Sequence, residues 1–166
     1  GGADAAWARA VGRPMLRACA ISERLQRLAL SHYERGEFGA AAEKYAEALR
    51  TVESGARDDK HCRACLHANV GACHRRQRRP DLAVAQCDLA LRLMPRYGRA
   101  LFRRAACLLE DGKPEQAILA FEALYRAERG WPRLSDWLVR AHAAARRSAH
   151  AADAVGDDDD DDGGGA

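Results

Sequence analysis

Aromatic residues, prolines and lysines are scarce in this chain. Aromatic side chains make up 6% of the 166 residues, and only five prolines occur. Hydrophobic residues reach 48%, but alanine supplies much of that share and β-branched residues are few. The side chains that stabilise β-sheets are therefore rare, whereas alanine, leucine and arginine are good helix formers. We expect an all-α protein with a single core.

Long apolar runs and secretion signals are also absent. No apolar stretch reaches the roughly 18 residues that a membrane-spanning helix needs. The start, Gly1-Gly2-Ala3-Asp4, does not show the charged-then-apolar pattern of a signal peptide. Six cysteines occur without a loop-rich framework around them, which is typical of reduced thiols inside the cell. We expect a monomer in the cytoplasm, with the nucleus as an alternative, and no membrane association.

Motifs that carry catalysis are missing as well. The chain has no glycine-rich loop to cradle a phosphate, no Ser-His-Asp arrangement at a strained turn, and no paired carboxylates in a defined pocket. We therefore expect neither enzymatic activity nor a cofactor.

The cysteine and histidine residues between His61 and His74 resemble a metal signature at first sight. However, Cys73 follows Cys65 by eight residues, which is about 12 Å along a helix. Zinc needs every ligand within about 2.3 Å, so one straight helix cannot close the site. The interval from Cys73 to Cys107 also equals that from Arg78 to Gly112, which indicates a repeated core position. We expect no metal; structural zinc is the alternative, and elemental analysis would detect it.

Because lysine is nearly absent, arginine carries the basic charge. The chain has 24 arginines and three lysines. Its formal net charge of +3 includes the six aspartates of Asp157–Asp162, so the remainder of the chain carries +9. Arginine binds carboxylates and phosphates through two parallel hydrogen bonds. This charge favours an acidic partner; a GC-rich coding bias, which raises alanine, arginine and glycine together, is the alternative explanation.

What the sequence does contain is internal repetition. Arg78 and Gly112 are equivalent points of two successive similar segments. Gly36 is the equivalent point of the first segment, and it precedes Arg78 by the same interval plus eight residues. The extra residues fall within Val52–Lys60. Around these points small residues recur in register, with a larger side chain four residues after each member of the second set. The small residues are Ala29, Gly71 and Ala105, then Ala41, Ala83 and Ala117, and the larger ones are Tyr45, Cys87 and Phe121.

A 34-residue helix-turn-helix period with these small residues resembles the tetratricopeptide repeat (TPR). The resemblance implies a right-handed α-solenoid of three helix pairs with a capping helix. The expected helices are 22–35 with 38–53, 60–77 with 81–93, 97–110 with 114–128, and a seventh from about 131 to 147. The expected domain is 14–149, with repeats at 22–55, 64–97 and 98–131 and a cap at 132–149. Residues 1–13 are expected to be weakly structured and 150–166 to form a disordered acidic tail.

Three polar residues are expected to face the concave groove of such a stack. Arg99 and Arg103 are four residues apart and share a helix face, and Asn69 precedes Arg103 by one full repeat. Two guanidiniums and one amide can hold a carboxylate. The pattern is similar to the clamp of heat-shock co-chaperone TPR domains, which hold a Glu-Glu-Val-Asp tail. The resemblance therefore implies an adaptor whose partner is the acidic tail of a heat-shock chaperone or another protein.

Two positions of the first repeat depart from that clamp. Where the co-chaperone families place a lysine and an asparagine, this chain has Gln26 and Leu30. Gln26 can still donate one hydrogen bond, whereas Leu30 cannot. Arg104 is expected to turn inward or sideways in the repeat and not to contact the ligand. Trp137 is a further candidate contact at the end of the groove, with packing in the cap as its alternative role.

Several alternatives remain open from the sequence. A scaffold without a clamp would use Asn69 to brace neighbouring helices and Arg99 and Arg103 as solvated or internally paired groups. The basic run Arg75–Arg79 could bind RNA phosphates, although no aromatic residue within it can stack bases. The acidic run Asp157–Asp162 could fold back onto the groove.

The order of elements also resembles TPR proteins that carry a J domain after their repeats. The lengthened junction, the segment Tyr97–Ala105 and the Trp131-Pro132 start of the cap carry that resemblance. The His-Pro-Asp triplet of a J domain does not occur in this chain.

Overall fold

A computed structural model describes residues 20–55 and 59–155, and every regular element in these ranges is a helix. The first helix covers residues 20–34 of the described part. The others are α2 (Phe38–Glu53), α3 (Lys60–Arg76), α4 (Pro80–Leu93), α5 (Gly98–Glu110), α6 (Pro114–Ala127) and α7 (Leu134–Val155). The all-α prediction is confirmed. None of the helices described is long and apolar enough to cross a membrane.

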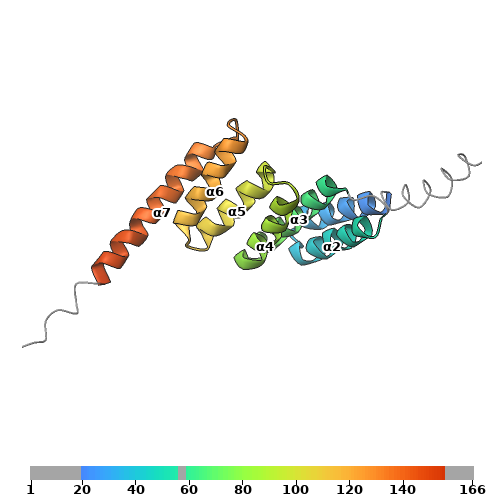
Figure 1. Cartoon of the computed structure of the whole chain (residues 1–166). Coiled ribbons are helices and arrows are strands. Elements are labelled where there is room, and N and C mark those ends of the chain that lie inside the picture. Colours follow the sequence, from blue (N-terminus) through green and yellow to red (C-terminus); the bar gives the residue numbers. More distant parts are fainter. Residues whose placement is uncertain (1–19, 56–58, 156–166) are drawn as a thin grey trace, which may run out of the picture.

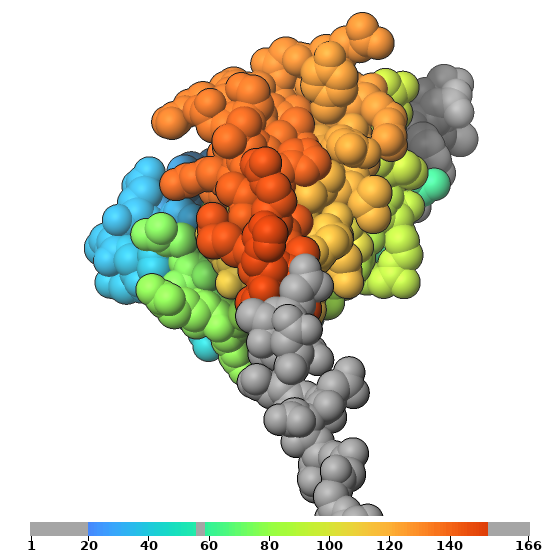
Figure 2. All heavy atoms as spheres, turned by 90° about the vertical axis from the view of Figure 1, so that its left-hand side faces the viewer, coloured from blue at the N-terminus to red at the C-terminus, as the bar shows by residue number. Residues whose placement is uncertain are grey.

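The helices form an elongated stack in which neighbours along the chain are neighbours in space (Figure 1). From α2 to α7 each helix contacts the next, and α3 also contacts α5. This is the arrangement of an α-solenoid, in which each pair packs only on adjacent pairs. Figure 2 looks onto the α7 end, where α7 lies beside α6 and covers the last repeat.

The predicted helix boundaries agree with the structure to within three residues, apart from the end of the last helix. Pro80 and Pro114 stand in the first turns of α4 and α6, where the missing N–H of proline breaks no helical hydrogen bond. α7, however, runs to Val155, beyond the expected end near residue 147. Its last turns are rich in alanine and contain neither glycine nor proline before Gly156, so the helix continues. Residues 1–19, 56–58 and 156–166 lie outside the described part.

The first helix of each pair ends in the same hydrogen-bonded turn. At the first turn the amides of Gly36 and Glu37 donate to the carbonyls of Tyr33 and His32. The equivalent bonds at the other two turns run from Arg78 and Arg79 to Arg75 and His74, and from Gly112 and Lys113 to Leu109 and Leu108. This paired pattern is the Schellman motif, which needs a left-handed residue just past the helix end. The three turns are therefore equivalent positions of one repeat.

Arg78 occupies the left-handed position that glycine holds in the other two turns. The φ angles are +80° at Gly36, +57° at Arg78 and +72° at Gly112. A residue with a Cβ atom is strained in this region by about 1–2 kcal/mol, whereas glycine is not. The middle repeat thus keeps an arginine where the local backbone favours glycine.

The core consists of small residues at the helix crossings and larger ones beside them. The fully buried alanines at these crossings include Ala29, Ala41, Ala83, Ala105 and Ala117. Tyr45, Cys87 and Phe121 are also buried, as the register of the repeats predicts. The short side chains let helix axes approach, and the larger ones fill the remaining space.

Gly71 lies where α3 and α4 approach each other closely. A Cβ atom added there would lie 3.1 Å from the carbonyl oxygen of Ala83 and 3.2 Å from Cys87 Sγ. We expect Gly71→Val to lower the free energy of unfolding by about 1–3 kcal/mol, because the branched side chain must force the helices apart. Urea denaturation followed by circular dichroism measures the change. An unchanged midpoint would show that the pair is loosely packed.

Candidate functional site

The first helices of the three pairs, together with Trp131, line a cleft of about 310 Å³, called here the groove cleft. Its walls come from the first helix, from α3 and from α5. The lining residues are Tyr33, Ala72, Arg75, Arg76, Arg99, Phe102, Arg103 and Trp131. Four of them are arginines, so the cleft carries the charge that an acidic ligand requires.

Asn69 and Arg103 meet across the gap between α3 and α5. Arg103 Nη1 donates a hydrogen bond to Asn69 Oδ1 over 3.1 Å, and both residues are partly buried. A guanidinium has five N–H donors, so this bond orients Arg103 and leaves other donors available. With its oxygen engaged, Asn69 still has two amide N–H donors. The contact can therefore preorganise a carboxylate site, and it also braces two repeats.

Arg99 lies one turn before Arg103 and lines the same cleft. It is exposed and has no ion-pair partner within the part of the chain that the structure describes. Arg104, by contrast, donates from Nε to Asp88 Oδ1 on α4 over 2.7 Å. The structure thus separates the arginines as the helical spacing predicts: Arg99 and Arg103 line the cleft and Arg104 points away from it.

Two further contacts tie α3 to α5 on either side of Asn69. Near the start of α3, Cys65 Sγ lies 3.2 Å from the hydroxyl of Tyr97. Near its end, Arg75 donates two hydrogen bonds to the carboxylate of Glu110, over 2.9 Å and 2.5 Å. Three contacts along α3, at Cys65, Asn69 and Arg75, therefore hold the helices of the groove together. They keep the hydrogen-bond donors in position before a ligand binds.

A second cleft of about 790 Å³ adjoins the first, called here the turn cleft. It shares Tyr33, Arg75 and Arg76 with the groove cleft. Its remaining lining residues are Phe38, Arg78, Pro80 and Glu110. The sequence contains no aromatic residue within the run Arg75–Arg79, but the fold brings two aromatic rings of the first repeat against it.

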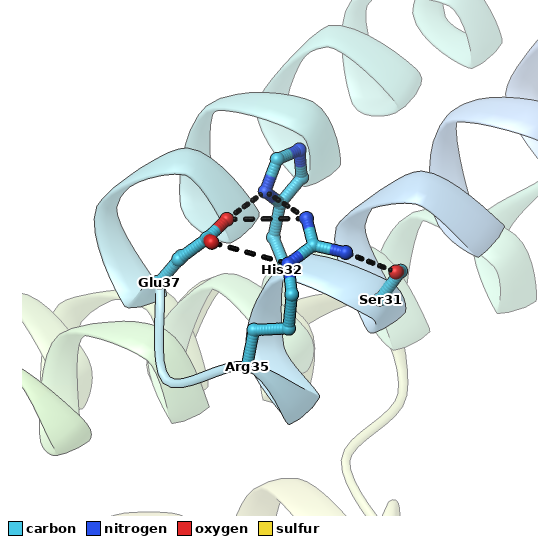
Figure 3. Close-up of polar contacts among 4 residues, drawn as sticks. All are labelled: Ser31, His32, Arg35 and Glu37. Atoms are coloured by element: carbon cyan, nitrogen blue, oxygen red, sulfur yellow. Dashed lines mark hydrogen bonds and ion pairs between the residues drawn. The ribbon is translucent and has the colours of Figure 1, made fainter.

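The two rings, those of Tyr33 and Phe38, flank the turn between the first helix and α2, and a polar network closes this turn. Figure 3 shows Arg35 donating to Ser31 and to the carboxylate of Glu37, which also contacts His32. The Arg35–Glu37 bonds are 3.1 Å each, and His32 Nδ1 lies 2.5 Å from Glu37 Oε2. The network closes the turn, and the rings of Tyr33 and Phe38 on either side of it meet edge to face at 5.1 Å.

We expect this network to contribute stability that depends on pH. The hydrogen bond from Arg35, and then that from His32, lowers the pKa of Glu37 from 4.5 to about 2. A depressed carboxyl pKa stabilises the fold above the unfolded-state pKa, and this contribution is lost as the pH falls towards 2. Thermal melts of the wild type and of Glu37→Gln should therefore converge between pH 5 and pH 2. A difference in melting temperature that stays constant with pH would contradict this.

Comparisons with known proteins bear on this architecture. No family model matches the chain. The chain is 34% identical over 112 residues to the HSP-interacting protein of Zea mays, a match covering 66% of this chain and 15% of the relative. It is 29% identical over 97 residues to DnaJ homolog subfamily C member 7 of Homo sapiens, covering 58% and 19%. The chain thus spans less than a fifth of the length of these relatives.

Among solved structures, one neighbour is the first TPR of Spaghetti (RPAP3) bound to the HSP90 peptide SRMEEVD. It has a TM-score of 0.67 at 20% identity, and the match covers 76% of this chain and 94% of the neighbour. The Hsp90 co-chaperone Cns1 of Saccharomyces cerevisiae has a TM-score of 0.73 at 19% identity, covering 82% and 43%. The chain has the tetratricopeptide repeat fold. It resembles the TPR domains of heat-shock co-chaperones in particular.

Within this TPR fold, the first repeat contributes Tyr33 to the groove cleft, whereas Gln26 and Leu30 do not line it. Gln26 Nε2 donates to Ser22 Oγ over 3.2 Å and lies 4.0 Å from Cys62 Sγ on α3. Leu30 is 50% exposed and lines neither cleft. The structure thus places Arg99 and Arg103 in the groove cleft and Asn69 against Arg103. Gln26 contacts Ser22 within its own helix and Cys62 on α3.

The structure places Trp137 in the packing of the TPR cap. Its ring lies 5.3 Å from that of Phe102 and 5.9 Å from that of Phe121, and the guanidinium of Arg140 covers it at 5.4 Å. Trp131 instead stacks on Phe102 at 5.7 Å and lines the groove cleft. Sequence reasoning missed Trp131 and Phe102 as groove residues, although Phe102 immediately precedes Arg103 on α5.

Three cysteines of the TPR helices are free thiols in the core. Cys73, Cys87 and Cys107 are buried, and burial raises their thiol pKa values to about 11, 12 and 11. Over residues 20–55 and 59–155, no group of three or more histidine, cysteine, aspartate or glutamate side chains could hold a metal ion. The acidic run Asp157–Asp162 lies outside these ranges, so its return to the groove stays a prediction.

Proposed function

We propose that this TPR domain is a non-enzymatic adaptor that binds the acidic C-terminal peptide of a heat-shock chaperone. The observation that carries the proposal is that Arg99 and Arg103 line one cleft and that Asn69, on the neighbouring helix, already orients Arg103. The names of the maize relative and of the peptide-bound neighbour support the choice of partner. The second TPR domain of human RPAP3, bound to an HSP70 peptide, adds similar support.

The proposed binding mode follows from the available donors. The terminal carboxylate of the peptide would receive hydrogen bonds from the guanidiniums of Arg99 and Arg103, which are charge-assisted and therefore stronger than neutral ones. The amide N–H groups of Asn69 would donate to a second oxygen of the peptide. Phe102 and Trp131 would contact its apolar side chain. The ties between α3 and α5 reduce the ordering cost on binding.

Isothermal titration calorimetry with an eight-residue peptide ending in Glu-Glu-Val-Asp tests this proposal. We expect micromolar affinity. The same peptide with an amidated C-terminus is the matched control, because it keeps the side chains and loses the terminal charge. Amidation should weaken binding at least tenfold. Absence of binding, or equal binding of both peptides, would refute the proposed mode.

A second candidate is a scaffold in which Asn69 and Arg103 only brace the repeats. Their direct hydrogen bond of 3.1 Å favours this alternative. The variant Asn69→Ala separates the two functions. If Asn69 only braces the repeats, the variant has a lower melting temperature and unchanged peptide affinity. If Asn69 is part of a clamp, the peptide affinity falls as well. A variant that melts earlier but binds as the wild type does would support the scaffold.

A further inference from the structure

The turn cleft presents positive charge beside the proposed peptide site. Arg75 is paired with Glu110, but Arg76 and Arg78 have no acidic partner within the described residues. Arg76 instead places its guanidinium 5.0 Å above the ring of Phe38. The side chains of Arg76 and Arg78 are exposed, so both charges remain available to a ligand.

The backbone at Arg78 gives an independent reason to regard this cleft as a site. Arg78 adopts the left-handed conformation at the turn where the first and third repeats have Gly36 and Gly112. Strained residues of this kind are often retained for function rather than for folding. Here the residue in the strained conformation is an arginine, and its side chain lines the turn cleft.

We propose that the turn cleft binds an acidic side chain that lies upstream of the C-terminal carboxylate in the same peptide. This inference rests on the proposed function and extends it to a second contact. Asn69 and Arg76 are separated along α3 by seven residues, or about 10 Å. An extended peptide covers that distance in about three residues. The position selected is therefore the acidic residue three places before the C-terminal one.

Peptide is favoured over RNA as the occupant because of how the aromatic rings lie. The face of Phe38 is covered by Arg76, and the Tyr33 and Phe38 rings meet edge to face. Stacking of a base needs an open ring face. The sharing of Tyr33, Arg75 and Arg76 between the clefts also makes them two parts of one peptide path.

The test combines protein and peptide variants. The proteins are the wild type, Arg76→Gln and Arg78→Gly, and the peptides end in Glu-Glu-Val-Asp or Gln-Glu-Val-Asp. Arg78→Gly restores the residue found in the other two turns, so the fold is preserved while the charge is removed. We expect the wild type to bind the first peptide about fivefold more tightly. Each variant should bind the two peptides with closely similar affinity.

Arg79→Gln is the matched control, because it removes the same charge from the same run without lining either cleft. It should retain the wild-type preference; if it loses the preference equally, or if the wild type has none, the second contact is refuted. Binding that still depends on Arg103 would then leave the proposed function intact, whereas no binding by the wild type refutes both. If the two variants lose single-stranded RNA binding but keep the peptide preference, the cleft is an RNA site.

Discussion

Replacing Arg103 with alanine is expected to weaken binding of the Glu-Glu-Val-Asp peptide at least tenfold. Arg103 lines the groove cleft from α5 and is held by Asn69 of α3. Truncation removes the charge-assisted hydrogen bonds from Arg103 to the carboxylate of the peptide. It also removes the hydrogen bond that positions the Asn69 amide, so a second donor is no longer held in place. Calorimetry at fixed salt measures the loss, since exposed charges are screened by ions.

Arg104→Ala is the matched control for that experiment. It deletes the same side chain one residue along α5, but Arg104 is paired with Asp88 on α4. We expect its affinity to stay within about twofold of the wild type, because a charge that lies outside the cleft and is paired with an aspartate contributes little to binding. If both variants weaken binding equally, net charge rather than a clamp attracts the peptide.

The largest expected effect on stability is that of Phe121→Ala. Phe121 is fully buried on α6, and its ring lies 6.1 Å from that of Phe102 and 5.9 Å from that of Trp137. Removing a buried aromatic ring costs about 3–5 kcal/mol, because the cavity closes only in part. A domain stable by about 5–15 kcal/mol would lose a large share of its stability. Urea denaturation at equilibrium measures the change.

Leu119→Ala on the same helix is the control for Phe121→Ala. Leu119 is 65% exposed, so its truncation should change the free energy of unfolding by less than about 0.5 kcal/mol. Because Phe121 supports Phe102, the Phe121 variant should also bind peptide less tightly at temperatures where it remains folded. A small stability loss at Phe121 would show that α7 does not close the core.

Local rules predicted much of the molecule. The positions of Pro80 and Pro114 and the equivalence of Gly36, Arg78 and Gly112 follow from short-range backbone chemistry, which the sequence displays directly. The separation of Arg103 from Arg104 follows from the helical period of 3.6 residues. The extension of α7 to Val155 was missed, because the alanine-rich segment that ends the helix gives no stop signal.

Contacts between repeats could not be predicted in the same way. Trp131 and Trp137 are both near the start of the cap, and only the packing of Phe102 decides which of them lines the groove cleft. The rings of Tyr33 and Phe38 belong to the first repeat, whereas Arg76 belongs to the second and is far from them in the sequence. Their contact depends on the rotation between successive helix pairs, which no local pattern encodes.

The sequence by itself determined the helices, their turns and the face of α5 that carries Arg99 and Arg103. Each of these depends on interactions within a few residues, so spacing alone suffices. The tertiary structure decided that Arg103 is held by Asn69, that Gln26 contacts Cys62 of α3, and that Arg76 and Arg78 share a cleft with two aromatic rings. These contacts depend on how closely, and at what angle, helices of different repeats approach. Small residues such as Gly71 and Ala105 permit the close approach, but they do not fix the orientation of the helices.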